Sequence, residues 1–189
     1  MRICVFCSSS NYLEKRYYEE ARHLGTLMGN FNHHLVYGGT HIGLMGELAQ
    51  SAKIAGATIT GVIPQIIYDK NLAADFADEL IITSDLRERK AVMECNADAF
   101  LALPGGFGTL EELFEIITLK QLGLHQKAVV LINTLGYFNP MIDFASQMAQ
   151  QKFVNQSFSS LYYVADNSAD ALSYIASYQP LELVEKWDG

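Results

Sequence analysis

The sequence is short of cysteine, of proline and of positive charge. It has 3 cysteines and 4 prolines in 189 residues, and 13 lysines and arginines against 21 aspartates and glutamates. Cys4 and Cys7 form a C-x-x-C pair inside an apolar stretch, and without a second such pair they make a poor zinc site. We therefore expect reduced, structural thiols and no bound metal.

The low positive charge and the lack of long apolar stretches disfavour proteins that bind nucleic acid or membranes. The net charge of −8 argues against a general nucleic-acid or membrane surface. No apolar stretch approaches the roughly 20 residues that would span a bilayer. The opening residues 1–7 are too short for a signal peptide and run directly into a strand pattern. We expect a cytoplasmic protein that binds neither nucleic acid nor membrane.

Short apolar runs alternate along the chain with helix-length patterns. The runs predict strands at Ile3–Cys7, His34–Tyr37, Thr58–Ile63, Glu79–Thr83, Ala99–Leu103, Ala128–Ile132 and Leu161–Val164. The longer patterns predict helices at Tyr12–Gly29, Gly43–Ala55, Asp85–Cys95, Gly108–Leu122, Tyr137–Gln151 and Ser168–Ser177. This alternation predicts a Rossmann-like, doubly wound parallel sheet with helices on both faces, in three layers. We expect one nucleotide-binding domain that spans residues 1–189.

Polar or glycine-rich turns follow three of the predicted strands, at the sheet edge where such folds bind ligands. Ser8, Ser9 and Ser10 follow the first strand, and residues 38–46 follow the second. Pro104-Gly105-Gly106-Phe107-Gly108-Thr109 follows the fifth strand and opens a helix. Because the first N–H groups of a helix have no partner within it, this last turn predicts an anion site, with phosphate as the expected anion.

Two common nucleotide sites are missing from these turns. The dinucleotide fingerprint G-x-G-x-x-G should follow the first strand, where the sequence reads Cys-Ser-Ser-Ser-Asn. No glycine turn continues into the Gly-Lys-Ser/Thr of a P-loop. The sequence therefore disfavours an NAD site and a P-loop nucleotide triphosphatase.

A basic cluster, Arg87, Arg89 and Lys90, occupies the start of a predicted helix. Asp85 and Glu88 have the spacing of a capping box, which places the helix N-terminus there. Cations at that end oppose the helix dipole, and such a breach of a local rule can mark function. A solvated, salt-bridged helix end is the alternative explanation.

Glu112 is the candidate catalytic carboxylate. Helical spacing predicts that Leu110, Leu113, Phe114 and Ile117 face the sheet. Glu112 then lies on a second stripe that carries further apolar residues, so we expect it to be partly buried under a neighbouring helix or a second subunit. The alternative is an ordinary first-turn acid that complements the helix dipole.

The segment 104–112, Pro-Gly-Gly-Phe-Gly-Thr-Leu-Glu-Glu, together with Glu88-Arg89-Lys90, resembles the LONELY GUY proteins. These are cytokinin riboside 5′-monophosphate phosphoribohydrolases, many of them formerly labelled lysine decarboxylases. The resemblance covers nearly the whole chain and includes Val5 to Ser10, Val36 to Gly39 and Gly43 to Gly46.

The resemblance implies hydrolysis of the N-glycosidic bond of an adenosine monophosphate, without a metal or another cofactor. It implies Arg89 and Glu112 as the catalytic residues, and a homodimer or larger oligomer with the site near the interface. We expect the substrate and its phosphate to be bound by Lys90, Gly105, Gly106, Phe107, Gly108, Thr109, Gly39, Ser8 and Ser9. Thr40, Arg87 and Asn71 depart from the usual family pattern.

Two other functions stay open. A nucleotide- or pterin-cofactor-binding carrier of the same superfamily would need the glycine turns but not the pairing of Arg89 with Glu112. A pyridoxal-phosphate decarboxylase would need a Schiff-base lysine in a cofactor pocket. The lysines outside the basic cluster, among them Lys53, Lys120, Lys127 and Lys152, are expected to be solvated. The sequence does not choose between AMP and an N6-modified AMP as substrate, and it does not identify the pathway.

Overall fold

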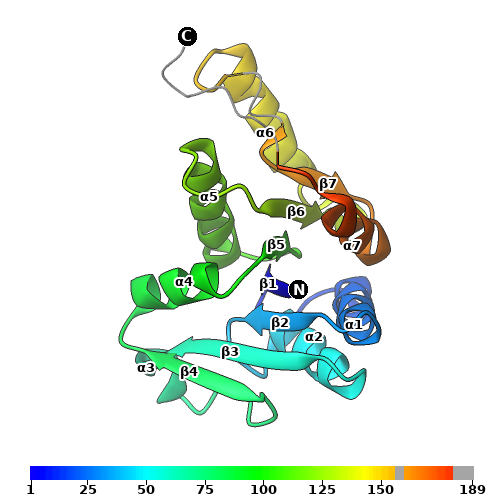
Figure 1. The fold of residues 1–189 in the computed structure, drawn as a ribbon, viewed down its shortest axis with the longest axis vertical. Helices are drawn as coiled ribbons and strands as arrows, with labels where there is room; N and C mark the ends of the chain where they lie inside the picture. Colours follow the sequence, from blue (N-terminus) through cyan, green and yellow to red (C-terminus); the bar gives the residue numbers. More distant parts are fainter. Residues whose placement is uncertain (156–159, 181–189) are drawn as a thin grey trace.

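One seven-stranded parallel sheet runs through the molecule (Figure 1). The computed structural model of the chain describes residues 1–155 and 160–180. The strands are β1 (Arg2–Phe6), β2 (His34–Tyr37), β3 (Thr58–Pro64), β4 (Glu79–Thr83), β5 (Ala99–Ala102), β6 (Ala128–Ile132) and β7 (Tyr163–Ala165), in the order β4-β3-β2-β1-β5-β6-β7. Each predicted strand is present, and the last is displaced toward the C-terminus.

The helices that follow the strands are those that the apolar periodicity predicts. They are α1 (Lys15–Asn30), α2 (Gly43–Ile54), α4 (Leu86–Cys95), α5 (Phe107–Gln121), α6 (Asn139–Gln150) and α7 (Ser168–Ser177). Two short elements were not predicted, the single turn α3 (Gln65–Tyr68) and the 3₁₀ turn η1 (Thr134–Gly136). A single turn is too short to show a helical period, so the sequence gives no signal for either element.

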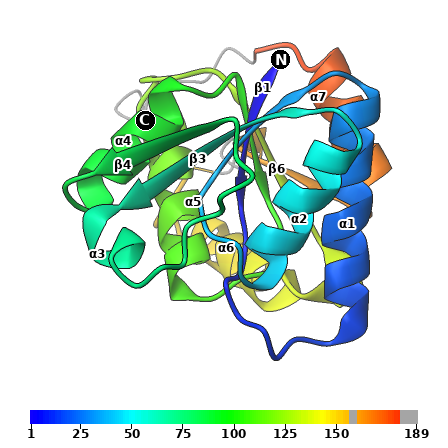
Figure 2. The same cartoon turned by 90° about the horizontal axis from the view of Figure 1, so that it is seen from below.

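Two apolar cores cover the two faces of the sheet. In β1, Ile3 and Val5 pack into the core under α1, α2 and α7, whereas Cys4 and Phe6 pack into the core under α4, α5 and α6. This alternation follows from the two-residue period of a strand. Figure 2 shows α1 and α2 on one side of the strands and α4 and α5 on the other. The predicted three-layer, doubly wound fold is confirmed.

The winding of the chain reverses between β1 and β5. After β1 the chain builds β2, β3 and β4 outward on one side, and it then returns to place β5 against the other side of β1. The connections that leave the carboxyl ends of β1 and β5 therefore diverge to opposite faces of the sheet. Such a point opens a crevice at the sheet edge, where ligands bind in folds of this kind.

The orientation of α5 corrects one expectation. Its buried residues are Thr109, Glu112, Leu113, Ile116 and Lys120, whereas Phe114 is exposed. The helix carries apolar residues on most of its circumference, so helical spacing alone does not decide which stripe meets the sheet. The face that contains Glu112 is the buried one.

Candidate active site

A cavity of about 460 Å³ lies at the point where the winding reverses. The loop after β1 and the loop after β5, which are joined by a hydrogen bond from Ser8 N–H to the Pro104 carbonyl, form neighbouring parts of its wall, and α4 contributes a third part. Of the eleven predicted site residues, eight line this cavity: Ser8, Ser9, Arg89, Gly106, Phe107, Gly108, Thr109 and Glu112. The fold thus gathers residues from three separate segments of the chain.

Arg89 and Glu112 form a buried ion pair in this cavity. Each residue is 7% exposed, and Arg89 Nη1 donates a hydrogen bond to Glu112 Oε1. Arg89 Nε donates a second bond to the carbonyl of Val62 at 2.9 Å. The guanidinium also passes close to Gly38, where a Cβ atom would lie 2.4 Å from Nη2. The pair is therefore held in one arrangement by two helices and the neighbouring strand ends.

The start of α4 sets the position of Arg89. The carboxylate of Asp85 accepts hydrogen bonds from the N–H groups of Arg87 and Glu88, as an N-cap residue does. The Glu88 carboxylate accepts a hydrogen bond of 2.7 Å from Ser84 N–H, one residue before the expected capping-box partner. With the helix start fixed, Arg89 points inward and the exposed Arg87 points away from the cavity.

Burial governs the electrostatics of the site. It raises the pKa of Glu112, and the neighbouring Arg89 guanidinium opposes that rise in part. Burial also raises the pKa of Cys7, and the Glu112 carboxylate raises it further. Cys7 lines the cavity as a protonated thiol, so it is not a nucleophile at neutral pH.

The N-terminus of α5 borders the cavity and is the predicted anion site. The first backbone bond of this helix runs from Leu110 N–H to the Gly106 carbonyl, so the N–H groups of Gly106, Phe107, Gly108 and Thr109 precede its hydrogen-bond ladder. No side-chain cap closes this end, and no acidic side chain occupies the first turn. The arrangement suits a phosphate group.

The N-terminus of α2 is closed by the protein itself. Gly43 N–H donates to Asn11 Oδ1 at 2.8 Å, and the N–H groups of Leu44 and Met45 donate to the Ser8 carbonyl. The glycine turn after β2 therefore anchors the loop after β1. The start of α2 is thus closed by other parts of the chain, whereas the start of α5 has no side-chain cap.

Three predicted ligand-binding residues lie outside the cavity lining. Lys90 pairs instead with Glu111 and, at 2.7 Å, with Glu115. Burial alone would lower the pKa of Lys90, but these two partners raise it. Gly39 accepts a bond from Ala74 N–H through its carbonyl, and Gly105 is buried behind the loop. Their expected contacts with a ligand stay predictions.

Much of the remaining lining of the cavity is apolar, and little in the sequence pointed to it. Its apolar lining consists of Ile42, Met45, Pro64, Ile67, Leu72 and Leu86. Three of these residues, Pro64, Ile67 and Leu72, come from the stretch 64–78. That stretch is tied down by a bridge between Thr40 and Ala73 and by the bond from His41 N–H to the Leu72 carbonyl. Thr40, which departs from the family pattern, lines the cavity and donates a hydrogen bond to the sulfur of Met45.

No lysine occurs among the residues that line this cavity. Lys120, which the sequence suggested was solvated, is in fact only 2% exposed, and its ammonium lies 4.9 Å from the centre of the Tyr178 ring. Burial lowers its pKa to about 8. It lies outside the cavity, so its geometry does not suit a Schiff-base lysine there. Within residues 1–155 and 160–180, no cluster of three His, Cys, Asp or Glu side chains could hold a metal ion.

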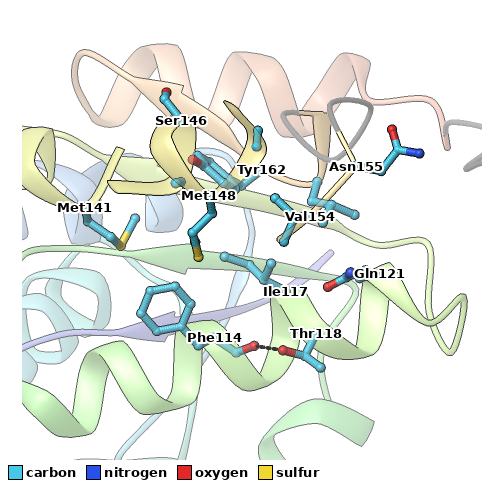
Figure 3. A pocket seen from close by; sticks show the side chains of 13 residues that line it. Phe114, Ile117, Thr118, Gln121, Met141, Ser146, Met148, Val154, Asn155 and Tyr162 are labelled. Carbon is cyan, nitrogen blue, oxygen red and sulfur yellow. Dashed lines mark hydrogen bonds between the residues drawn. The ribbon is translucent and has the colours of Figure 1, made fainter. Parts of the chain in front are cut away.

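A second cavity, of about 500 Å³, lies between α5 and α6. In Figure 3, Phe114 and Ile117 of α5 point toward Met141 and Met148 of α6, and Tyr162 closes one side. Apolar side chains dominate this lining, and it contains no titratable side chain apart from Tyr162. It has the character of a contact surface rather than of a reaction site.

Comparison with known proteins places the chain in a family. A family model described as "Possible lysine decarboxylase" matches residues 45–175. A cytokinin riboside 5′-monophosphate phosphoribohydrolase of Arabidopsis thaliana is 38% identical over 180 residues, which are 95% of this chain and 79% of the relative. The chain belongs to the LONELY GUY family.

Other similarities agree with this assignment. A probable LONELY GUY phosphoribohydrolase of Oryza sativa is 38% identical over 95% of this chain and 73% of its own. Among solved structures, the Moco carrier protein of Chlamydomonas reinhardtii superposes with a TM-score of 0.72 at 23% identity, over 93% of this chain and 94% of its own. The molybdenum cofactor binding protein of Rippkaea orientalis gives a TM-score of 0.70 at 20% identity, over 93% of this chain and 95% of its own. These distant structures share the fold of the LONELY GUY chain.

No helix in the described part of the chain is both long enough and apolar enough to cross a membrane.

Proposed function

We propose that this LONELY GUY protein hydrolyses the N-glycosidic bond of an adenosine 5′-monophosphate and releases the free purine base and ribose 5-phosphate. The observation that carries the proposal is the buried Arg89–Glu112 pair in a cavity that also contains the open N-terminus of α5. Relatives with 38% identity are named for this reaction on cytokinin riboside 5′-monophosphates.

Glu112 acts on the sugar carbon. As the bond between C1′ and the base nitrogen breaks, its electron pair leaves with the base and positive charge develops on the ribose. A carboxylate beside C1′ stabilises that charge and takes a proton from the water whose oxygen bonds to C1′. The departing base takes up a proton at its nitrogen, so one water is consumed overall. The raised pKa of Glu112 makes it a stronger base than an exposed glutamate.

Arg89 keeps that carboxylate in place. Its bonds to Glu112 and to the Val62 carbonyl fix the guanidinium plane, so Glu112 stays oriented without reorganisation during the reaction. The positive charge also favours the ionised form of Glu112, which is the form that the reaction needs.

The two ends of the cavity orient the nucleotide. The N–H groups of Gly106 to Thr109 receive the 5′-phosphate, and the serines of the neighbouring loop after β1 also line the cavity. Lys90 is engaged by two carboxylates, so we assign the phosphate to the helix start and Lys90 to holding α4 against α5. The apolar end, with Ile67 and Leu72, suits a purine that carries an apolar N6 substituent better than plain adenine.

We further propose that the protein is a homodimer formed across the groove between α5 and α6. Phe114 is a large, exposed apolar residue on the rim of this groove, and Met141 and Met148 give it a deformable surface. The groove also lies on α5, the helix that carries Glu112, so a second copy there would stabilise the site helix. In such a dimer the site would lie near the subunit interface. We also propose that the protein functions in the cytoplasm.

The test is product analysis. The purified protein is incubated with AMP and, separately, with N6-isopentenyl-AMP, and nucleotide, base and ribose 5-phosphate are separated by chromatography. We expect base release from both and faster release from the N6-modified substrate. Release should be lost in Glu112→Gln and kept in Glu19→Gln, whose carboxylate pairs with Lys15 at the surface.

Absence of base release from both substrates, in a folded and dimeric preparation, would contradict the hydrolase proposal. Tight nucleotide binding without turnover would then favour the carrier function instead.

A further inference from the structure

The loop after β6 contacts the glycine loop through a residue that does not line the cavity. Tyr137 lies just after η1, and its hydroxyl donates a hydrogen bond of 2.6 Å to the carbonyl of Gly105. Tyr137 does not line the cavity, and neither does Gly105. This hydrogen bond therefore connects the glycine loop to a residue outside the cavity. A direct contact between Tyr137 and a ligand would not account for it.

The ring of Tyr137 is held firmly. It meets Tyr17 of α1 edge-on, with the ring centres 6.1 Å apart, and Phe138 edge-on at 5.2 Å. Asn133 accepts a bond from Phe138 N–H at 2.8 Å and so closes the loop. Leu135 is in the left-handed region with φ of 58°, which few residues other than glycine adopt. A turn kept in this unfavourable conformation presents the hydroxyl to Gly105.

Peptide geometry transmits this contact to the cavity. In a planar trans peptide the C=O of one residue and the N–H of the next point in opposite directions. The described backbone contains no cis peptide bond. When the Gly105 carbonyl points at Tyr137, the Gly106 N–H must point the other way. Gly106 lines the cavity, whereas Tyr137 does not. Because neither residue has a Cβ atom, this peptide would otherwise rotate easily.

We propose that Tyr137 is a positioning residue, which orients the Gly105–Gly106 peptide so that the Gly106 N–H is presented to the 5′-phosphate of the substrate. The inference rests on the phosphate position in the proposed function. It does not require that the protein hydrolyse the nucleotide, because orientation of the N–H matters for binding alone. Tyr137 acts through the loop and not by touching the substrate.

The experiment compares Tyr137→Phe with the wild-type protein by calorimetric titration of ribose 5-phosphate and of adenosine. The variant keeps the ring and its edge contacts and removes only the hydroxyl. Loss of one neutral hydrogen bond predicts about fivefold weaker binding of ribose 5-phosphate, which corresponds to about 1 kcal/mol. Adenosine has no phosphate, so its affinity should be unchanged, and that result also shows that the site is folded.

The matched control is Tyr163→Phe, which removes a hydroxyl that bonds to Asp170 beside β7 at the sheet edge. It should alter neither affinity. With AMP as substrate, Tyr137→Phe should raise KM about fivefold and leave kcat within twofold of the wild-type value.

Equal weakening for ribose 5-phosphate and adenosine would show a general structural role and would overturn the inference. Unchanged binding of ribose 5-phosphate in Tyr137→Phe would also overturn it, as would a wild-type protein that does not bind ribose 5-phosphate. Selective weakening in a protein that fails to release base would uphold the role of Tyr137 while the hydrolase proposal falls.

Discussion

Replacement of Glu112 by glutamine distinguishes the catalytic role of this carboxylate from its role in the stability of the fold. The side chain keeps its size, and its amide oxygen can still accept the bond that Arg89 Nη1 now donates to Oε1. The negative charge and the basicity are lost. Removal of a positioned general base costs typically 10²- to 10⁴-fold in rate. We expect kcat for Glu112→Gln to fall by at least about a hundredfold.

The loss in free energy of unfolding when Glu112 is replaced depends on which side chain remains beside Arg89. Glu112→Ala leaves a guanidinium that is 7% exposed without its counter-charge, and breaking such a buried pair costs about 3–5 kcal/mol. Glu112→Gln keeps an acceptor, and Arg89 Nε retains its bond to the Val62 carbonyl, so a smaller cost of about 1–3 kcal/mol is expected. Arg89→Met combined with Glu112→Leu removes both charges and should be more stable than Glu112→Ala.

The assay is steady-state base release together with denaturant unfolding for each variant. A Glu112→Gln protein that is folded and turns over within tenfold of the wild-type rate would refute the catalytic assignment. A Glu112→Ala protein as stable as the wild type would refute the reasoning about the buried pair.

Four further outcomes are expected. Burial raises the pKa of Glu112, and the ionised form is the active one. In a pH–rate profile, kcat/KM should therefore fall as the pH decreases, with a midpoint above the ordinary glutamate pKa of about 4.3. In Gly105→Ala the new Cβ would lie 2.1 Å from Thr109 Oγ1, so thermal unfolding should show that the free energy of unfolding falls by about 1–3 kcal/mol. Gly108→Ala is the control and should not be destabilised, because a Cβ atom there would have no other atom within 4 Å. Lys120 has a pKa lowered to about 8 in the folded protein, so the unfolded chain binds the extra proton and stability should rise from pH 8 to pH 10; melting curves of Lys120→Met should lack this rise. Phe114→Glu should yield monomers in light scattering if the groove between α5 and α6 is the dimer interface; dimers that persist would contradict that placement.

The α/β fold could be predicted from the sequence because its signals are local. Apolar runs such as Ala99 to Leu103 and the helix patterns between them require only the neighbouring residues to be recognised. The end of a strand followed by Gly105 and Gly106 marks the anion-binding loop for the same reason, since the turn and the helix start are contiguous. The boundaries of elements were less certain, as the shifted start of β7 shows.

The pairing at the centre of the site could be expected from a family resemblance, but spacing alone did not establish it. Arg89 and Glu112 are 23 residues apart on different helices, and only the packing of α4 against α5 makes them partners. The same packing redirects Lys90 to Glu111 and Glu115, which the sequence did not indicate. A charged side chain chooses its partner by distance and burial, and both are tertiary quantities.

The sequence by itself determined the class of fold, and it predicted the edge of the sheet where we place the ligand and the residue types that could act there. These follow from periodicity and turn chemistry, which act over a few residues. The tertiary structure decided which face of α5 is buried, that the start of α2 is closed by Asn11 while the start of α5 stays open, and that Tyr137 supports the glycine loop. Each of these features depends on contacts between segments far apart in the chain, and no local sequence pattern determines the free energies of those contacts.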